Sequence, residues 1–123
     1  MFCPSHVASM ECYARYISVL ERLGYSVKLG SNFTKDTYGY AASAQERADD
    51  LNELVAADEV QMILFSGGES AVEVLPYIDY ENIRKHPKLF SSYSDGTSIL
   101  NAIYAQTGLI TYYGAGAALV KAH

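Results

Sequence analysis

The sequence contains no tryptophan, only two cysteines and three prolines, and no long hydrophobic run. Cys3 and Cys12 are too few for a disulfide framework, which favours a reducing compartment. Their spacing with His6 matches no zinc-binding pattern, so no metal is expected. No apolar stretch approaches the roughly 20 residues that cross a bilayer, and residues 1–6 lack the features of a secretory signal. We therefore expect a cytoplasmic protein without membrane association.

Positive charge is also scarce, since nine Lys and Arg stand against 14 Asp and Glu, for a net charge of −5. Phosphate binding needs a basic stripe and none is visible, so no nucleic-acid partner is expected. The 123 residues, half of them hydrophobic, suit one globular domain with a single core. Tyrosine supplies 11 of the aromatic residues. We expect the tyrosines of the second half to lie at interfaces between helices and sheet.

Helical and extended patterns alternate along the chain, with no internal repeat. Helices are predicted at about 9–23, 44–57, 69–74, 80–86 and 97–106. Extended segments are predicted at 1–4, 25–29, 60–65, 89–93 and 109–113. Such alternation with short connections predicts an α/β fold, an open parallel sheet of about five strands between helical layers, Rossmann- or flavodoxin-like.

Local signals place several helix ends. Ser43 and Glu46 have the spacing of a capping box, in which each side chain bonds the other residue's backbone N–H. Asp79 can cap the short helix that follows it. Gly24 and Gly108 each follow a helical pattern, where a left-handed residue commonly ends the helix.

Ligands of open parallel sheets bind at the carboxyl ends of the strands, and three loops are predicted there: 66–69, 93–95 and 114–116. The middle loop carries Ser94 between an apolar strand and a helix, which makes Ser94 the best nucleophile candidate. The backbone N–H of Asp95 is adjacent in sequence, where it can stabilise an oxyanion. Gly67 and Gly68 have no Cβ, so a second backbone N–H can approach the same point.

The serine signal has a competing explanation, because Ser94 and Asp95 could simply cap the helix that begins near Gly96. The local sequence alone favours that simpler interpretation. No histidine makes a convincing base for the serine. His86 is expected to be a solvated helix-end residue, and nothing in the sequence places His6 against the serine.

The acidic residues near the diglycine are equally open to more than one interpretation. Glu69 either lines a substrate pocket or is simply exposed to solvent, and nothing in the sequence decides between them. Glu73 is expected on the surface of a short helix. Gly67-Gly68 is too short for a dinucleotide-binding or P-loop motif, and no lysine follows it, so no cofactor is expected.

Several blocks nevertheless form a recognisable pattern. They are the strand ending in Gly67-Gly68, the stretches 75–84 and 87–88, Tyr93-Ser94-Asp95 with Thr97, and the stretch 104–114. In order and spacing they resemble the N-terminal domain of the LD-carboxypeptidase family, and most of all its microcin C self-immunity branch. The resemblance covers essentially the whole chain.

The resemblance implies a serine peptidase with a serine, glutamate and histidine triad. Ser94 would be the nucleophile, and the backbone N–H groups of Asp95 and Gly68 would form the oxyanion hole. From their place in the loop predicted beside that serine, Gly67 and Glu69 are the substrate-binding candidates. The glutamate and histidine would come from a C-terminal domain that residues 1–123 do not include. The implied substrates are L,D-peptide bonds of cell-wall peptides, or the amide that joins an aminoacyl group to a nucleotide-like toxin.

Three positions depart from the family pattern. Ser92 replaces a glycine, Gly96 replaces an aliphatic residue and should loosen the start of the helix, and Ala115 replaces a proline. The departures bear on activity more than on fold, so a non-catalytic α/β domain that binds a ligand or a partner is the alternative. Without its base the isolated chain should show little or no turnover. Its uncovered apolar face should also make it a homodimer.

Overall fold

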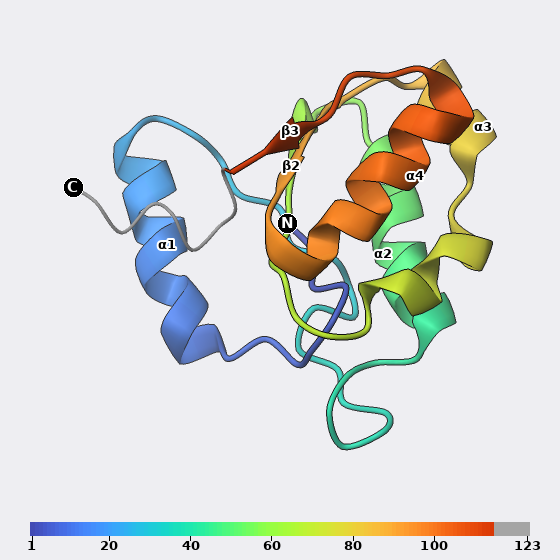
Figure 1. Ribbon diagram of the computed structural model, residues 1–123. Helices are drawn as coiled ribbons and strands as arrows, with labels where there is room; N and C mark the ends of the chain where they lie inside the picture. The colour runs from blue at the N-terminus through green and yellow to red at the C-terminus, as the bar shows by residue number, and fades with distance from the viewer. Residues whose placement is uncertain (115–123) are drawn as a thin grey trace.

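The computed structural model describes residues 1–114, in which a three-stranded parallel sheet has helices on both faces (Figure 1). The strands are β1 (Met62–Leu64), β2 (Leu89–Ser92) and β3 (Tyr112–Tyr113), in the spatial order β1-β2-β3. The predicted α/β architecture with a parallel sheet is confirmed. The predicted count of five strands is not, because only three strands form within this part of the chain.

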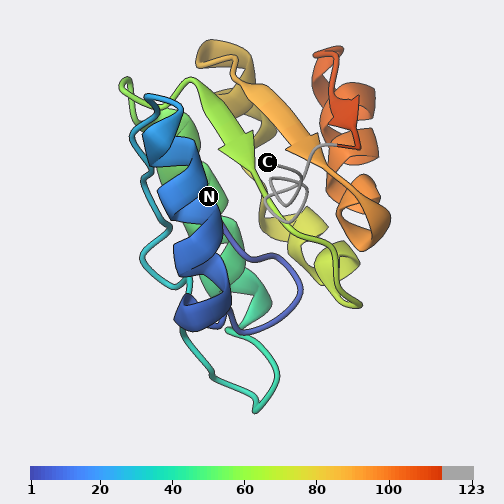
Figure 2. The ribbon, with the colours of Figure 1, turned by 90° about the vertical axis from the view of Figure 1, so that its left-hand side faces the viewer.

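The helical segments are α1 (Met10–Arg22), α2 (Ala44–Ala56), the 3₁₀ segment η1 (Ala71–Tyr77), α3 (Tyr80–Lys85), the 3₁₀ turn η2 (Ser94–Gly96) and α4 (Thr97–Thr107). Figure 1 shows α1 on one side of the sheet and α2, α3, α4 and η1 on the other. Turned by 90°, α1 lies in front of the sheet on its β1 side (Figure 2). Among the described residues, no helix is long and apolar enough to cross a membrane.

The two missing strands are those predicted nearest the N-terminus. In the segment 1–4, only Phe2 pairs with the sheet, through an isolated parallel bridge to Phe65. The segment 25–29 forms no strand, although the Met1 amino group donates to the Lys28 carbonyl and the Gly30 N–H donates to the Met1 carbonyl at 2.9 Å. A ladder needs successive partners, and here a single residue provides both contacts.

The main core fills the space between the sheet and the helices of the α2 side. Phe65 directly follows β1, and Phe90 lies within β2. Leu51 comes from α2, and Ile99 and Ile103 come from α4. All five side chains are buried. Their burial fixes the carboxyl ends of β1 and β2 relative to each other, and those ends carry the candidate site.

A smaller cluster lies under α1. Tyr13 is the one fully buried residue of that helix, and its ring meets Phe33 edge-on with 4.9 Å between centroids. Cys3 packs in the same cluster, and its sulfur lies 3.5 Å from the Tyr13 hydroxyl. The first residues of the chain are thereby anchored next to the sheet.

The predicted helix ends are confirmed. Ser43 Oγ accepts the Glu46 N–H at 3.2 Å, and Glu46 Oε2 accepts the Ser43 N–H at 2.8 Å, which completes the capping box. Asp79 accepts the backbone N–H three residues further on. Gly24 and Gly108 have φ values of +91° and +73°, the left-handed conformation that stops a helix.

The tyrosines of the second half do not all lie where the sequence predicted. Tyr104, Tyr112 and Tyr113 are each half or more exposed. Since β3 has only two residues and pairs on one edge only, its side chains gain little cover from the described residues. Met62 and Leu89, paired at the start of β1 and β2, are also exposed.

Candidate active site

The turn between β2 and α4 contains a strained serine. Ser94 has a φ of +53°, and it is the only non-glycine residue with positive φ among residues 1–114. Such a conformation costs a residue with a Cβ roughly 1 to 2 kcal/mol. Ser94 is exposed, and no side chain or backbone group in the described part of the chain hydrogen-bonds its hydroxyl. A serine held this way at the end of a buried strand has the form of a nucleophile elbow.

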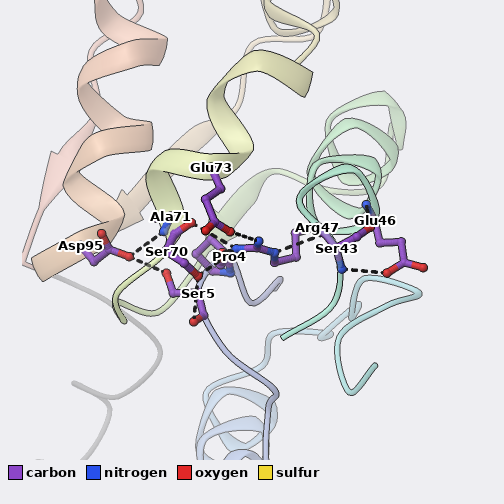
Figure 3. Close-up of polar contacts among 9 residues, drawn as sticks. All are labelled: Pro4, Ser5, Ser43, Glu46, Arg47, Ser70, Ala71, Glu73 and Asp95. Carbon is purple, nitrogen blue, oxygen red and sulfur yellow. Dashed lines mark hydrogen bonds and ion pairs between the residues drawn. The ribbon is translucent and has the colours of Figure 1, made fainter. Parts of the chain in front are cut away.

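The simpler explanation, that Ser94 and Asp95 cap the following helix, is wrong. No side chain caps η2 or α4. The Asp95 carboxylate is turned away from α4 instead, and its Oδ2 accepts the Ser5 hydroxyl at 2.7 Å and the Ala71 N–H at 2.8 Å (Figure 3). The side chain of Asp95 thus caps η1 from a neighbouring segment.

The diglycine loop passes directly against the serine turn. A Cβ placed on Gly67 would lie 2.9 Å from the Cβ of Ser94 and 3.0 Å from the Tyr93 carbonyl oxygen. Only glycine allows this approach of backbone to backbone. Gly68 is equally constrained, since a Cβ there would lie 2.2 Å from the Cβ of Ser5. The structure therefore brings the predicted diglycine to the predicted nucleophile.

A hollow of about 470 Å³ lies beside this loop, lined by Ser5, His6, Tyr40, Gly68, Glu69, Ser70 and Glu73. Glu69 is exposed to solvent and also lines the hollow, and its contact with substrate stays a prediction. Its carboxylate has no hydrogen bond or ion pair with any described residue. The hollow consequently offers an unneutralised negative charge next to the diglycine.

Neither described histidine hydrogen-bonds Ser94. His6 is half-buried in the lining of the hollow, 3.9 Å from the sulfur of Cys3. Burial lowers the pKa of His6, and a hydrogen bond with the Gly67 backbone opposes that shift. His86 ends α3 as the sequence predicted, and His123 lies outside the described residues. No complete triad forms within residues 1–114.

Arg47 is a site component that the sequence analysis missed. It is 2% exposed, and its Nη1 donates to the carbonyl oxygens of Pro4 and, at 3.2 Å, Ser70 (Figure 3). Its Nη2 lies 2.6 Å from a carboxylate oxygen of Glu73, which is exposed on η1 as the sequence predicted. Position 47 shares a helix face with Leu51, and this spacing was the signal that its side chain points inward.

The two departures nearest the serine fit each other. Ser92 is fully buried, and its hydroxyl donates to the Phe65 carbonyl at 2.9 Å. A Cβ on Gly96 would lie 2.1 Å from the Ser92 Oγ, so the Ser92 hydroxyl occupies the space that a side chain at 96 would need. Gly96 has ordinary helical dihedral angles, and α4 begins directly after it. The third departure, Ala115, lies outside the described residues.

A parallel α/β sheet with a strained, exposed serine at its carboxyl edge and a glycine backbone against it is typical of hydrolases that use serine. The family model for the LD-carboxypeptidase N-terminal domain matches residues 1–114. The chain belongs to this family of carboxypeptidases.

Known relatives agree with this assignment. Over 97 residues the chain is 44% identical to a Bacillus subtilis (strain 168) protein described as a murein peptide carboxypeptidase, covering 77% of this chain and 30% of that protein. It is 36% identical over 112 residues to the microcin C7 self-immunity protein of Escherichia coli, covering 90% of this chain and 33% of that protein.

A solved structure of a microcin C7 self-immunity protein, in complex with aspartyl sulfamoyl adenosine, has the same fold. It matches with a TM-score of 0.88 at 34% identity, over 94% of this chain and 36% of that one. The chain thus spans about a third of the length of the curated relatives it matches.

Proposed function

We propose that this chain is the nucleophile-bearing part of a serine carboxypeptidase of the LD-carboxypeptidase type. In this proposal Ser94 attacks the carbonyl carbon of the scissile amide, and the backbone N–H groups of Asp95 and Gly68 stabilise the oxyanion. The observation that supports it most is the left-handed backbone of Ser94, with its hydroxyl exposed and the Gly67 backbone packed against the turn. Strain of this kind persists only where the surrounding structure enforces it.

The general base belongs, in this proposal, to a second domain. A serine hydroxyl needs an adjacent base, and no histidine of the described residues contacts Ser94. The relatives are about three times as long as the matched segment, so they have ample chain to supply a histidine and a glutamate. Residues 1–123 alone should therefore show little or no turnover, because serine and base act as a unit.

The substrate is proposed to lie across Gly67 with one end in the hollow. Family membership supports a peptide with a terminal L,D-bond, and the microcin relative supports an aminoacyl-nucleotide amide. The unpaired carboxylate of Glu69 would attract a positively charged group of either substrate.

A chimera tests the proposal directly. Residues 1–114 would replace the matching third of the Bacillus subtilis relative, whose remaining two-thirds supply the rest of the catalytic centre. We expect the chimera to release D-alanine from a tetrapeptide with a terminal L,D-bond or to cleave an aminoacyl-nucleotide amide. Ser94→Ala should abolish this activity, whereas Ser98→Ala, a change of the same size at the second residue of α4, should retain it.

Two results would contradict the proposal. One is a Ser94→Ala chimera that is as active as its parent. The other is a chimera that folds with the thermal stability of the relative yet hydrolyses neither substrate. The second result would favour the alternative of a non-catalytic α/β domain that binds a ligand or a partner.

A further inference from the structure

The carboxylate of Asp95 joins three segments that are far apart in sequence. Its Oδ2 accepts the hydroxyl of Ser5 at 2.7 Å and the N–H of Ala71 at 2.8 Å. Figure 3 shows both bonds converging on this one oxygen. Hydrogen bonds to an ionised acceptor are about twice as strong as neutral ones. The loop after the first residues, the start of η1 and the serine turn are therefore held together at a single charged group.

Ser5 transmits this contact to the diglycine. Its side chain fills the space beside Gly68, where an added Cβ would lie 2.2 Å from the Cβ of Ser5. Ser5 is buried, and its carbonyl accepts the hydroxyl of Ser70 at 3.2 Å. Because Asp95 fixes the Ser5 hydroxyl, it also fixes the surface against which Gly68 packs.

Arg47 holds the same loops from the other end. It donates to the carbonyl of Pro4 and to the carbonyl and hydroxyl of Ser70, the latter at 3.1 Å. Ser70 and Ala71, which follow the diglycine loop, thus lie between the buried cation of Arg47 and the carboxylate of Asp95 (Figure 3). Of these two charged groups, only Asp95 belongs to the turn that carries Ser94, so Asp95 sets the position of the loop relative to the serine.

We infer that the Asp95 side chain is a positioning group, which holds the Gly68 backbone N–H in register with Ser94. The role is additional to the backbone N–H of Asp95, and its catalytic consequence rests on the proposed function. The positioning itself is a property of the folded chain, so it can be measured without any hydrolysis.

The test uses Asp95→Asn in the 123-residue chain, with backbone amide signals recorded by ¹H–¹⁵N NMR. Asparagine keeps the shape of the side chain and an acceptor oxygen but loses the charge. We expect the Ala71 amide proton to move upfield, because its hydrogen bond weakens, and the Gly68 amide signal to shift. Exchange of the Ala71 amide should accelerate about tenfold or more, while the amides of α2 keep their protection.

Asp79→Asn is the matched control, because Asp79 caps α3 through the same kind of bond, at 2.9 Å, away from the diglycine. It should leave the Gly68 signal unchanged. Should Asp95→Asn fail to fold, Ser5→Ala removes only the bond from the Ser5 hydroxyl, and it should shift the Gly68 amide signal while the Ala71 signal stays in place. An unchanged Gly68 signal, unchanged exchange of the Ala71 amide, or an equal loss of protection throughout the chain would each overturn the inference.

In an active chimera the same variant has a kinetic signature. A misplaced oxyanion donor weakens transition-state binding more than substrate binding, so Asp95→Asn should lower kcat about tenfold to a hundredfold with little change in KM. A rise in KM with no change in kcat would contradict the positioning role. An inactive parent chimera would instead count against the proposed function, and the NMR result would stand independently of it.

Discussion

At the scale of single residues, the backbone of Ser94 opposes stability. Glycine adopts a φ of +53° without steric cost, whereas a residue with a Cβ does not. We expect Ser94→Gly to be more stable than Ser94→Ala by about 1 kcal/mol, because both lose the hydroxyl and only one loses the strain. Urea unfolding of the two variants measures the difference. Equal stabilities would mean that the turn relaxes when the hydroxyl is removed.

Ser92 and Gly96 form a second residue-scale test, because their side-chain volumes exclude each other. Gly96→Ala alone places a Cβ 2.1 Å from the Ser92 Oγ and should cost about 2 kcal/mol. Removing the hydroxyl in Ser92→Gly/Gly96→Ala should recover part of that cost, with a coupling of at least about 1 kcal/mol. A double-mutant cycle by urea unfolding measures it. Additive costs would show that the two positions are independent.

The residues of the site differ in how far the sequence could predict them. Ser94 and the diglycine follow from strand ends and turn residues, which are local signals. The Asp95 carboxylate bonds Ser5, which lies 90 positions away in the sequence, and no local sequence pattern predicts such a contact. Arg47 is intermediate. The spacing of its helix predicts that its side chain points inward, but nothing in the sequence predicts that it donates to the carbonyls of Pro4 and Ser70.

At the scale of the secondary-structure elements, α2 depends on the capping box at its start. A hydrogen bond from Lys35, with further bonds from Thr37 and the Ser43 backbone, lowers the pKa of Glu46 to about 2. Since this lies below the usual 4.5, ionised Glu46 stabilises the fold above about pH 4.5, and that stabilisation is lost as the pH falls toward 2.

We therefore expect Glu46→Gln to flatten the decline in stability between pH 4.5 and 2, the window set by this shift. Thermal unfolding across this range measures the effect. Glu11→Gln, which changes an exposed glutamate of α1, should leave the slope unchanged. Parallel curves for Glu46→Gln and the unmutated chain would contradict the prediction.

Helices were easier to predict from the sequence than strands, because helix ends depend on nearby residues and strands depend on distant ones. The ends of α2, α3 and α4 were predictable because their caps lie within a few residues of the helix. The segment 25–29 has the alternation of a strand, but a strand also needs a partner along its length. In the described part of the chain, its strand-like backbone hydrogen bonds, at Lys28 and Gly30, reach a single residue, Met1.

At the scale of the whole molecule, apolar side chains remain exposed along one end and one edge of the sheet, among them Met62, Leu89, Ile110 and Tyr113. Apolar surface of this kind tends to be covered. We expect the 123-residue chain to self-associate as a dimer, and Ile110→Lys with Tyr113→Lys to shift it toward monomer. Light scattering at high concentration measures the mass, and a monomer in the unmutated chain would contradict the prediction.

A chimera with the remaining two-thirds of a relative should behave differently, if the same face is where a second domain packs. In that case it should be no more prone to dimerise than the relative itself. Persistent dimerisation through Ile110 and Tyr113 in the chimera would instead assign this surface to a partner copy.

The contact between Ser5 and Gly68 has a practical consequence for anyone handling the protein. Leading residues are routinely trimmed or fused to affinity tags on the assumption that they are dispensable. Here Pro4 and Ser5 are buried, and they form one wall of the diglycine loop. A deletion of the first five residues would therefore disturb the candidate site itself, and an inactive chimera made that way would say nothing about Ser94.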